Sequence, residues 1–123
     1  MKYALQLYAV RDSITDEKTL IDALQKLKKM GYDGVEFAGY YGIEPLRIKE
    51  ILAETGMAGV GCHAGIDPLE NDLENTLQSA AAIGLTKVSM SWSAADSPEE
   101  IAHTLRVLEA AKQAAKQYSI DIS

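Results

Sequence analysis

The 123-residue chain contains a single cysteine, Cys62, so no disulfide can form within it. A chain without internal disulfides is typical of a reducing compartment. Basic residues are also scarce, with 12 against 18 acidic ones, and the formal net charge is −6. This balance argues against nucleic acid or an anionic membrane as the main partner, because both bind basic surfaces.

Long apolar runs are absent as well. No segment approaches the roughly 18 apolar residues of a membrane span, and no signal-peptide pattern follows Met1. We therefore predict a cytoplasmic protein with no membrane partner. The composition, 47% hydrophobic and 24% charged, is that of an ordinary globular domain. Because no linker or low-complexity stretch interrupts it, residues 1–123 are expected to form a single domain.

What the chain does contain is a regular alternation of short apolar segments and amphipathic ones. The first kind predicts strands at residues 3–10, 34–38, 58–63 and 87–92, with the first residues of a fifth strand at 120–122. The second kind predicts four intervening helices, three of which end at a glycine just before the next strand: Gly31, Gly56 and Gly84. Ser97 and Pro98 predict the start of the fourth helix, with Ser97 as its N-cap.

Four such strand–helix units indicate a parallel α/β fold, either a doubly wound open sheet or a (β/α)₈ barrel. No G-x-G-x-x-G follows the first strand, so a dinucleotide-binding fold has no support. Polar residues fall instead at the carboxyl ends of the predicted strands, where barrels carry their functional groups. A complete barrel needs about 250 residues. The prediction is therefore a (βα)₄ half of a TIM barrel with a fifth-strand stub.

Three segments support a more specific interpretation. They are LQLYAVRD at residues 5–12, GYDGVEFAGYYG at 31–42 and VGCHAG at 60–65. In order and spacing they resemble the opening of sugar phosphate isomerases/epimerases of the xylose isomerase-like TIM-barrel superfamily. The resemblance extends from Tyr3 to about Trp92 and covers the N-terminal half of such a barrel.

The resemblance implies an isomerase or epimerase that moves a proton through an enediolate. Such enzymes hold one divalent metal (Mn, Mg or Zn) with Glu, Asp, His and Glu from strands five to eight. The metal polarises a carbonyl, and a carboxylate moves the proton. Those positions lie outside residues 1–123. We therefore predict no metal ligand and no catalytic residue within the chain, and whether it is an enzyme by itself is left open.

Residues at the strand ends are predicted to bind a small-molecule sugar or polyol. The set comprises Gln6, Tyr8, Glu36, His63 and Trp92. For Glu36 a pocket wall is favoured over an ion-paired strand end. For His63 a pocket hydrogen bond competes with a histidine held by a backbone carbonyl, and for Trp92 stacking on a sugar competes with simple packing.

Alternation along a strand adds further expectations for the neighbouring side chains. It places Gln6 and Tyr8 on one face of the first strand, and it turns Cys62 away from His63 into the core. Tyr40 and Tyr41 are expected to form an aromatic, lid-like loop.

A half-barrel leaves two strand edges and, by expectation, an apolar inner face open. The chain can be a piece of a longer protein, pair with a second copy or a complementary half-barrel, or flatten into an open sheet. We favour truncation in origin with self-association as a homo-dimer. The functional alternative to an isomerase fragment is a non-catalytic half-barrel that binds a polyol or a partner chain.

Overall fold

The structure is a computed structural model, and it describes residues 3–90 and 96–123. The elements follow one another as β1 (Ala4–Gln6), the 3₁₀ helix η1 (Leu7–Ser13), α1 (Glu17–Lys29), β2 (Gly34–Phe37), α2 (Pro45–Thr55), β3 (Ala58–Ala64), α3 (Ile66–Asn71), α4 (Leu73–Ile83), β4 (Lys87–Met90), α5 (Pro98–Ala115), the 3₁₀ helix η2 (Lys116–Tyr118) and β5 (Asp121–Ile122).

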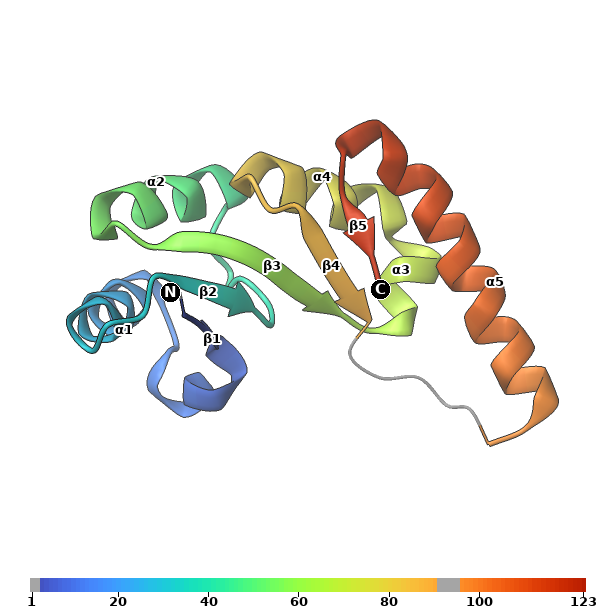
Figure 1. The fold of residues 1–123 in the computed structure, drawn as a ribbon, viewed down its shortest axis with the longest axis horizontal. Helices are drawn as coiled ribbons and strands as arrows, with labels where there is room; N and C mark the ends of the chain where they lie inside the picture. The colour runs from blue at the N-terminus through green and yellow to red at the C-terminus, as the bar shows by residue number, and fades with distance from the viewer. Residues whose placement is uncertain (1–2, 91–95) are drawn as a thin grey trace.

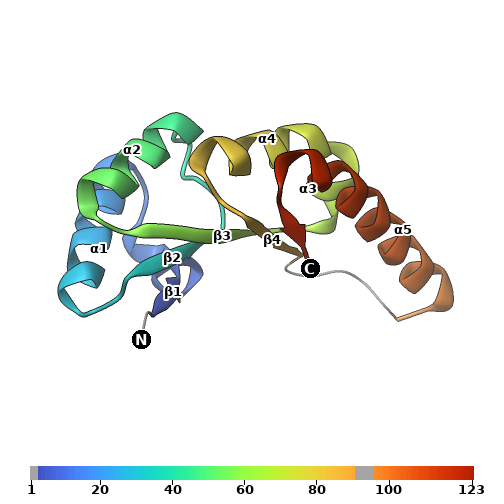
Figure 2. The ribbon, with the colours of Figure 1, turned by 45° about the horizontal axis from the view of Figure 1, so that its top comes forward.

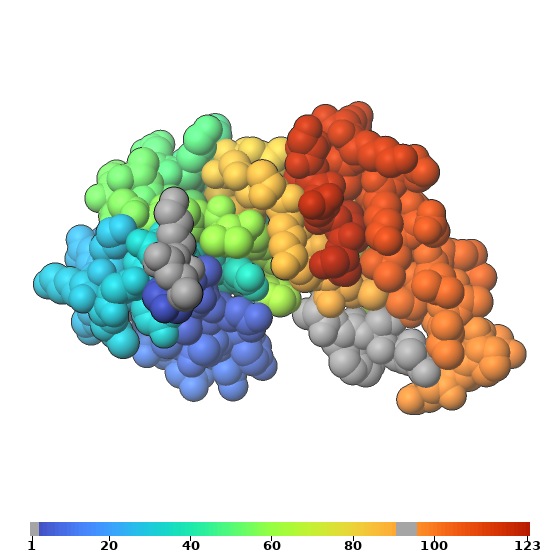
Figure 3. All heavy atoms as spheres, in the orientation of Figure 1, coloured from blue at the N-terminus to red at the C-terminus, as the bar shows by residue number. Residues whose placement is uncertain are grey.

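The strands form one five-stranded parallel sheet in the order β1-β2-β3-β4-β5. Figures 1 and 2 show the helices in an arc along one face of this sheet, with α1 and α5 at its two ends. In the space-filling view the molecule is a crescent, with residues 3–13 at one tip and α5 at the other (Figure 3). The predicted partial TIM barrel is thereby confirmed.

The core lies between the sheet and this helical layer. Val35, Phe37 and Val88 from the strands are fully buried. They meet fully buried leucines and isoleucines from the helices: Leu20, Leu24, Ile48, Ile51 and Leu77. The helices begin and end largely where the sequence predicts, because their stop signals are local. Gly56 and Gly84 end α2 and α4 in the left-handed conformation, with φ of 70° and 95°.

The first predicted strand is too long. It was expected over residues 3–10, but β1 ends at Gln6, and Leu7–Ser13 coil into η1. Leu7 is fully buried in this turn. A continuous apolar run does not distinguish a buried strand from a buried helical turn, which explains the error. The third predicted helix is also interrupted at Asp72, whose φ of −139° separates α3 from α4.

The face of the sheet that the helices leave uncovered is not apolar, and this expectation was wrong. Strand pairing places alternate residues on it, and those of β4 and β5 are polar: Lys87, Ser89 and Asp121. Among the described residues of the strands, Val60 is the large apolar side chain exposed there, at 38%. Residues along each strand alternate between the helix side and the open side, so the apolar side chains pack under the helices while polar ones lie on the open face.

Candidate functional site

Glu36 and His63 meet at the carboxyl ends of two neighbouring strands. The Glu36 Oε2 and His63 Nε2 atoms lie 3.0 Å apart, and each side chain is 24% exposed. Both residues were predicted as site residues, and the structure brings them into direct contact. His63 is therefore held by a carboxylate, and within residues 3–90 and 96–123 no backbone carbonyl is its partner. The strand-end pairing considered for Glu36 is present as a side-chain hydrogen bond, and its partner is the other candidate residue.

A β-bulge at Val60 makes this contact possible. Val35 pairs with Gly59, but Glu36 pairs with Gly61, so Val60 is an extra residue in β3. Without that extra residue, alternation counted from Ala58 would turn His63 toward the helices. The bulge shifts the alternation by one, so that His63 shares the open face with Glu36 while Cys62, 6% exposed, packs in the core.

Gly61 permits the close strand pairing beside this bulge. A methyl group on it would lie 2.8 Å from the backbone oxygen of Lys87 in β4. A side chain at this position would force β3 and β4 apart. The glycine therefore keeps the strand that carries His63 close to its neighbour, although the residue itself has no functional group.

The loop after β2 is built from glycine and tyrosine. Gly39, Tyr41 and Gly42 have φ values of 105°, 56° and 73°, in the left-handed region that glycine adopts easily. Tyr40 packs its ring on Phe37, with 5.7 Å between ring centroids, and its hydroxyl lies against Cys62. Burial, and then the nearby Cys62, raise the pKa of Tyr40, and burial raises the pKa of Tyr41. Both rings pack against the core and anchor the loop, while its lid-like role stays a prediction.

Of the other predicted site residues, the structure describes Gln6 and Tyr8. Gln6 ends β1, is exposed, and pairs in register with Glu36. Tyr8 lies in η1 with 57% of its surface exposed. The predicted shared strand face of Gln6 and Tyr8 is wrong, because the strand ends between them. Trp92 lies outside the described residues.

Sequence reasoning missed Arg11 at the same end of the sheet. Its guanidinium carbon lies 4.0 Å from the centroid of the Tyr8 ring, and its Nη1 donates a hydrogen bond to the Tyr8 carbonyl oxygen at 2.9 Å. The spacing of three residues within a turn could have indicated this contact, but only if residues 7–13 had been recognised as helical.

The described residues do not form a metal site. Residues 3–90 and 96–123 contain no cluster of three or more His, Cys, Asp or Glu side chains that could hold an ion. The Glu36–His63 pair offers two donors, whereas zinc in proteins takes three or four ligands from the protein. What the pair can do is exchange hydrogen bonds with hydroxyl groups, since a carboxylate accepts and an imidazole both donates and accepts.

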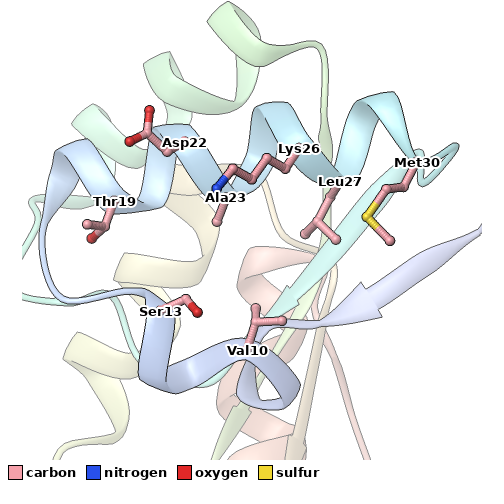
Figure 4. Close-up of a pocket in the computed structure, with 8 residues that line it drawn as sticks. All are labelled: Val10, Ser13, Thr19, Asp22, Ala23, Lys26, Leu27 and Met30. Atoms are coloured by element: carbon pink, nitrogen blue, oxygen red, sulfur yellow. The ribbon is translucent and has the colours of Figure 1, made fainter.

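Three cavities formed by described residues lie away from this pair. One of about 310 Å³ separates η1 from α1 and is lined by Val10, Leu27 and Met30 with a polar rim, as Figure 4 shows. Another, of about 540 Å³, lies at the amino ends of β1, β2 and β3, opposite the Glu36–His63 pair. A third, of about 260 Å³, lies between α5 and the α3–α4 segment. None of the helices within the described ranges has the length and apolar character required to cross a bilayer.

Comparison with known proteins gives no match to a protein-family model or to a curated protein sequence. The fold does match solved structures. A sugar phosphate isomerase/epimerase from Parabacteroides distasonis is 16% identical, with a TM-score of 0.81 over 98% of this chain and 49% of its own. A family 2 AP endonuclease from Brucella melitensis is 13% identical, with a TM-score of 0.78 over 98% and 53%.

The protein IOLI, whose structure contains a bound zinc atom, is 14% identical, with a TM-score of 0.74 over 100% of this chain and 50% of its own. The chain thus spans about half the length of the structures it matches. At these identities the likeness concerns the fold, and it confirms the predicted resemblance at that level: residues 1–123 have the fold of about half of a xylose isomerase-like TIM barrel.

Proposed function

We propose that this chain provides a sugar- or polyol-binding wall of an isomerase- or epimerase-type barrel. The observation that carries the proposal is the Glu36–His63 hydrogen bond at the carboxyl ends of β2 and β3. In TIM-barrel enzymes this end of the sheet is where substrates bind. One structural neighbour is a sugar phosphate isomerase/epimerase, which supports a sugar as the ligand class.

The chemistry of the pair suits hydroxyl groups. If His63 donates its Nε2 proton to Glu36, its Nδ1 atom becomes an acceptor for a ligand hydroxyl. The second carboxylate oxygen of Glu36 can accept another hydroxyl proton. Two adjacent hydroxyls on a sugar or polyol would therefore be bound together, and Glu36 would keep the imidazole of His63 in a fixed orientation and tautomer.

A divalent metal is not assigned to these residues, because the described side chains do not supply enough ligands. We propose that any metal and the proton-transfer groups of the reaction come from other strands of the barrel. A titration of the purified chain with Mn²⁺ checks this point. No stoichiometric binding is expected, and tight 1:1 binding that Glu36→Gln abolishes would contradict the assignment.

The binding proposal is tested by titrating sorbitol, a neutral polyol, into the chain by calorimetry. Hydrogen bonds to charged groups are worth about 1.5–3 kcal/mol. Glu36→Gln and His63→Ala are therefore each expected to weaken binding about 10- to 100-fold. The chain's second histidine, His103 on α5, gives the matched control. His103→Ala should leave the affinity unchanged, and equal effects of both histidine variants would contradict the proposal.

The second candidate is a non-catalytic half-barrel that pairs with a second copy of itself. Two exposed apolar surfaces at opposite ends of the crescent favour it. Met30, 71% exposed, borders the cavity beside α1, and α5 presents Ile101 and Leu105, 45% and 56% exposed. In a closed barrel each helix packs between two neighbours, whereas α1 and α5 lie at the ends of the arc.

We propose that residues 1–123 form one domain. In the dimer, its two exposed apolar surfaces would contact the apolar surfaces of a second copy. Sedimentation velocity should give a dimer, and Met30→Ser or Leu105→Ser should shift it toward monomer. Leu46→Ser on α2 is the control, because Leu46 is 65% exposed but lies away from both ends of the arc. A stable monomer at all concentrations would overturn the pairing and leave the binding proposal untouched.

A further inference from the structure

Arg11 is the first cation that follows β1 in the sequence, and its side chain makes two contacts with Tyr8. The guanidinium lies 4.0 Å above the Tyr8 ring, and Nη1 donates to the Tyr8 carbonyl oxygen at 2.9 Å. The contact with the ring holds the face of the guanidinium, and the hydrogen bond uses one of its five N–H donors. The remaining donors of the planar fork are left for another acceptor.

No carboxylate of the described residues occupies those donors. Every ion pair that the described chain forms within 4.0 Å involves another cation: Arg47, His63 or His103. Arg47 differs from Arg11, because its guanidinium is surrounded by carboxylates. It contacts Glu17 at 2.9 Å, Glu50 at 3.2 Å and Glu54 at 2.9 Å. In a chain with six more acidic than basic residues, Arg11 lacks such partners within the described ranges, even though Asp12 follows it directly.

The position of Arg11 relates it to the candidate site. η1 follows β1 without a break, and the last residue of β1, Gln6, pairs in register with Glu36. η1 also packs on β2, the strand that carries Glu36. Tyr8 and Arg11 are therefore at the same carboxyl edge of the sheet as the Glu36–His63 pair, and Figure 1 shows η1 beyond the end of β1 at that edge.

We propose that Arg11, oriented by its stack on the Tyr8 ring, binds the oxyanion of the ligand, a phosphate or a carboxylate, while Glu36 and His63 bind its hydroxyls. This inference rests on the proposed function and specifies its substrate class as an anionic sugar or polyol. The guanidinium fork matches the geometry of two oxygens on one phosphorus or carbon. The stack on Tyr8 orients the fork before the ligand arrives, which reduces the entropy lost on binding.

The test compares three ligands by calorimetry: neutral sorbitol, sorbitol 6-phosphate and gluconate. Wild type should bind at least one of the anionic ligands about 10- to 100-fold more tightly than sorbitol, as expected for charge-assisted hydrogen bonds. Arg11→Gln should abolish this preference and leave the affinity for sorbitol unchanged. The ligand that loses more affinity in Arg11→Gln identifies the oxyanion as phosphate or carboxylate.

Matched variants distinguish direct binding of the anion by Arg11 from the general effect of removing one positive charge. Arg106→Gln on α5 removes the same charge from an exposed arginine and should keep the preference. Tyr8→Phe retains the ring and should act as wild type, whereas Tyr8→Leu removes the stack and should reduce the preference. Circular dichroism of each variant verifies folding.

The outcomes separate the two proposals. Equal binding of neutral and anionic ligands, or an equal loss in Arg11→Gln and Arg106→Gln, would overturn the role of Arg11 while sorbitol binding still depends on His63. Loss of that dependence on His63 would instead overturn the proposed function. An anion preference that survives in His63→Ala and disappears in Arg11→Gln would support the anion-binding role of Arg11, independently of the role of His63.

Discussion

Glu36 and His63 are 27 positions apart in the chain, yet the Oε2 atom of one lies 3.0 Å from the Nε2 atom of the other. Two features produce this contact. Parallel pairing places the ends of β2 and β3 at one edge of the sheet, and the bulge at Val60 turns His63 to the side on which Glu36 lies. The pair is thus a product of the backbone register and not of the local sequence around either residue.

A double-mutant cycle measures this pair directly. With Glu36→Gln, His63→Gln and the double variant, urea unfolding at pH 7 should give a coupling free energy of about 0.5–1.5 kcal/mol. The value is expected at the low end of that range, because each side chain is 24% exposed and water screens the interaction.

The chain's other histidine–carboxylate pair is the control for this cycle. His103 Nε2 lies 2.5 Å from Glu70 Oε2, but the side chains are 47% and 36% exposed. Its coupling should be smaller, since exposed ion pairs contribute little. A larger coupling for His103 and Glu70 than for Glu36 and His63 would show that partial burial does not strengthen the strand-end pair.

Gly61 gives a second prediction, which concerns the strand that carries His63. Gly61→Ala would place a methyl group 2.8 Å from the Lys87 backbone oxygen, so β3 and β4 would have to separate. We expect a loss of about 1–3 kcal/mol in the free energy of unfolding, which is typical of overpacking, and a weaker Glu36–His63 coupling.

Gly65→Ala is the matched control for Gly61→Ala. Gly65 has φ of −75°, which any residue adopts, and the nearest atom to its added methyl would be Pro68 Cδ at 3.8 Å. This variant should unfold at nearly the wild-type urea concentration. If both alanine variants were equally stable, the close approach of Gly61 to β4 would not limit the packing.

Much of the fold could be predicted from the sequence because its signals are local. Gly56 and Gly84 each stop a helix by adopting positive φ, and Ser97 accepts a hydrogen bond from the backbone N–H of Glu100, as expected of an N-cap. Each of these features depends on a few neighbouring residues.

The features that the sequence did not predict depend on pairing between distant segments. Tyr8 was placed in a strand because residues 3–10 are nearly all apolar, but β1 keeps its register with β2 only as far as Gln6. The bulge at Val60 likewise exists only relative to β2. Glu36 and His63 were recognised as site residues individually, while their mutual contact required the register of both strands.

Cys62 gives the last prediction, which concerns pH. Burial raises the pKa of its thiol in the folded chain, although the neighbouring Tyr40 hydroxyl opposes the shift. The unfolded thiol ionises first, near pH 8.5. Its contribution to stability is therefore complete below that pH and is lost as the pH rises toward the folded pKa, by at most about 1.4 kcal/mol per pH unit. Urea unfolding between pH 7 and 9.5 should show wild type losing stability faster than Cys62→Ala, which lacks the thiol. Parallel curves would contradict a raised pKa, as would rapid thiol labelling of the folded protein at pH 8, since the thiolate is the reactive form.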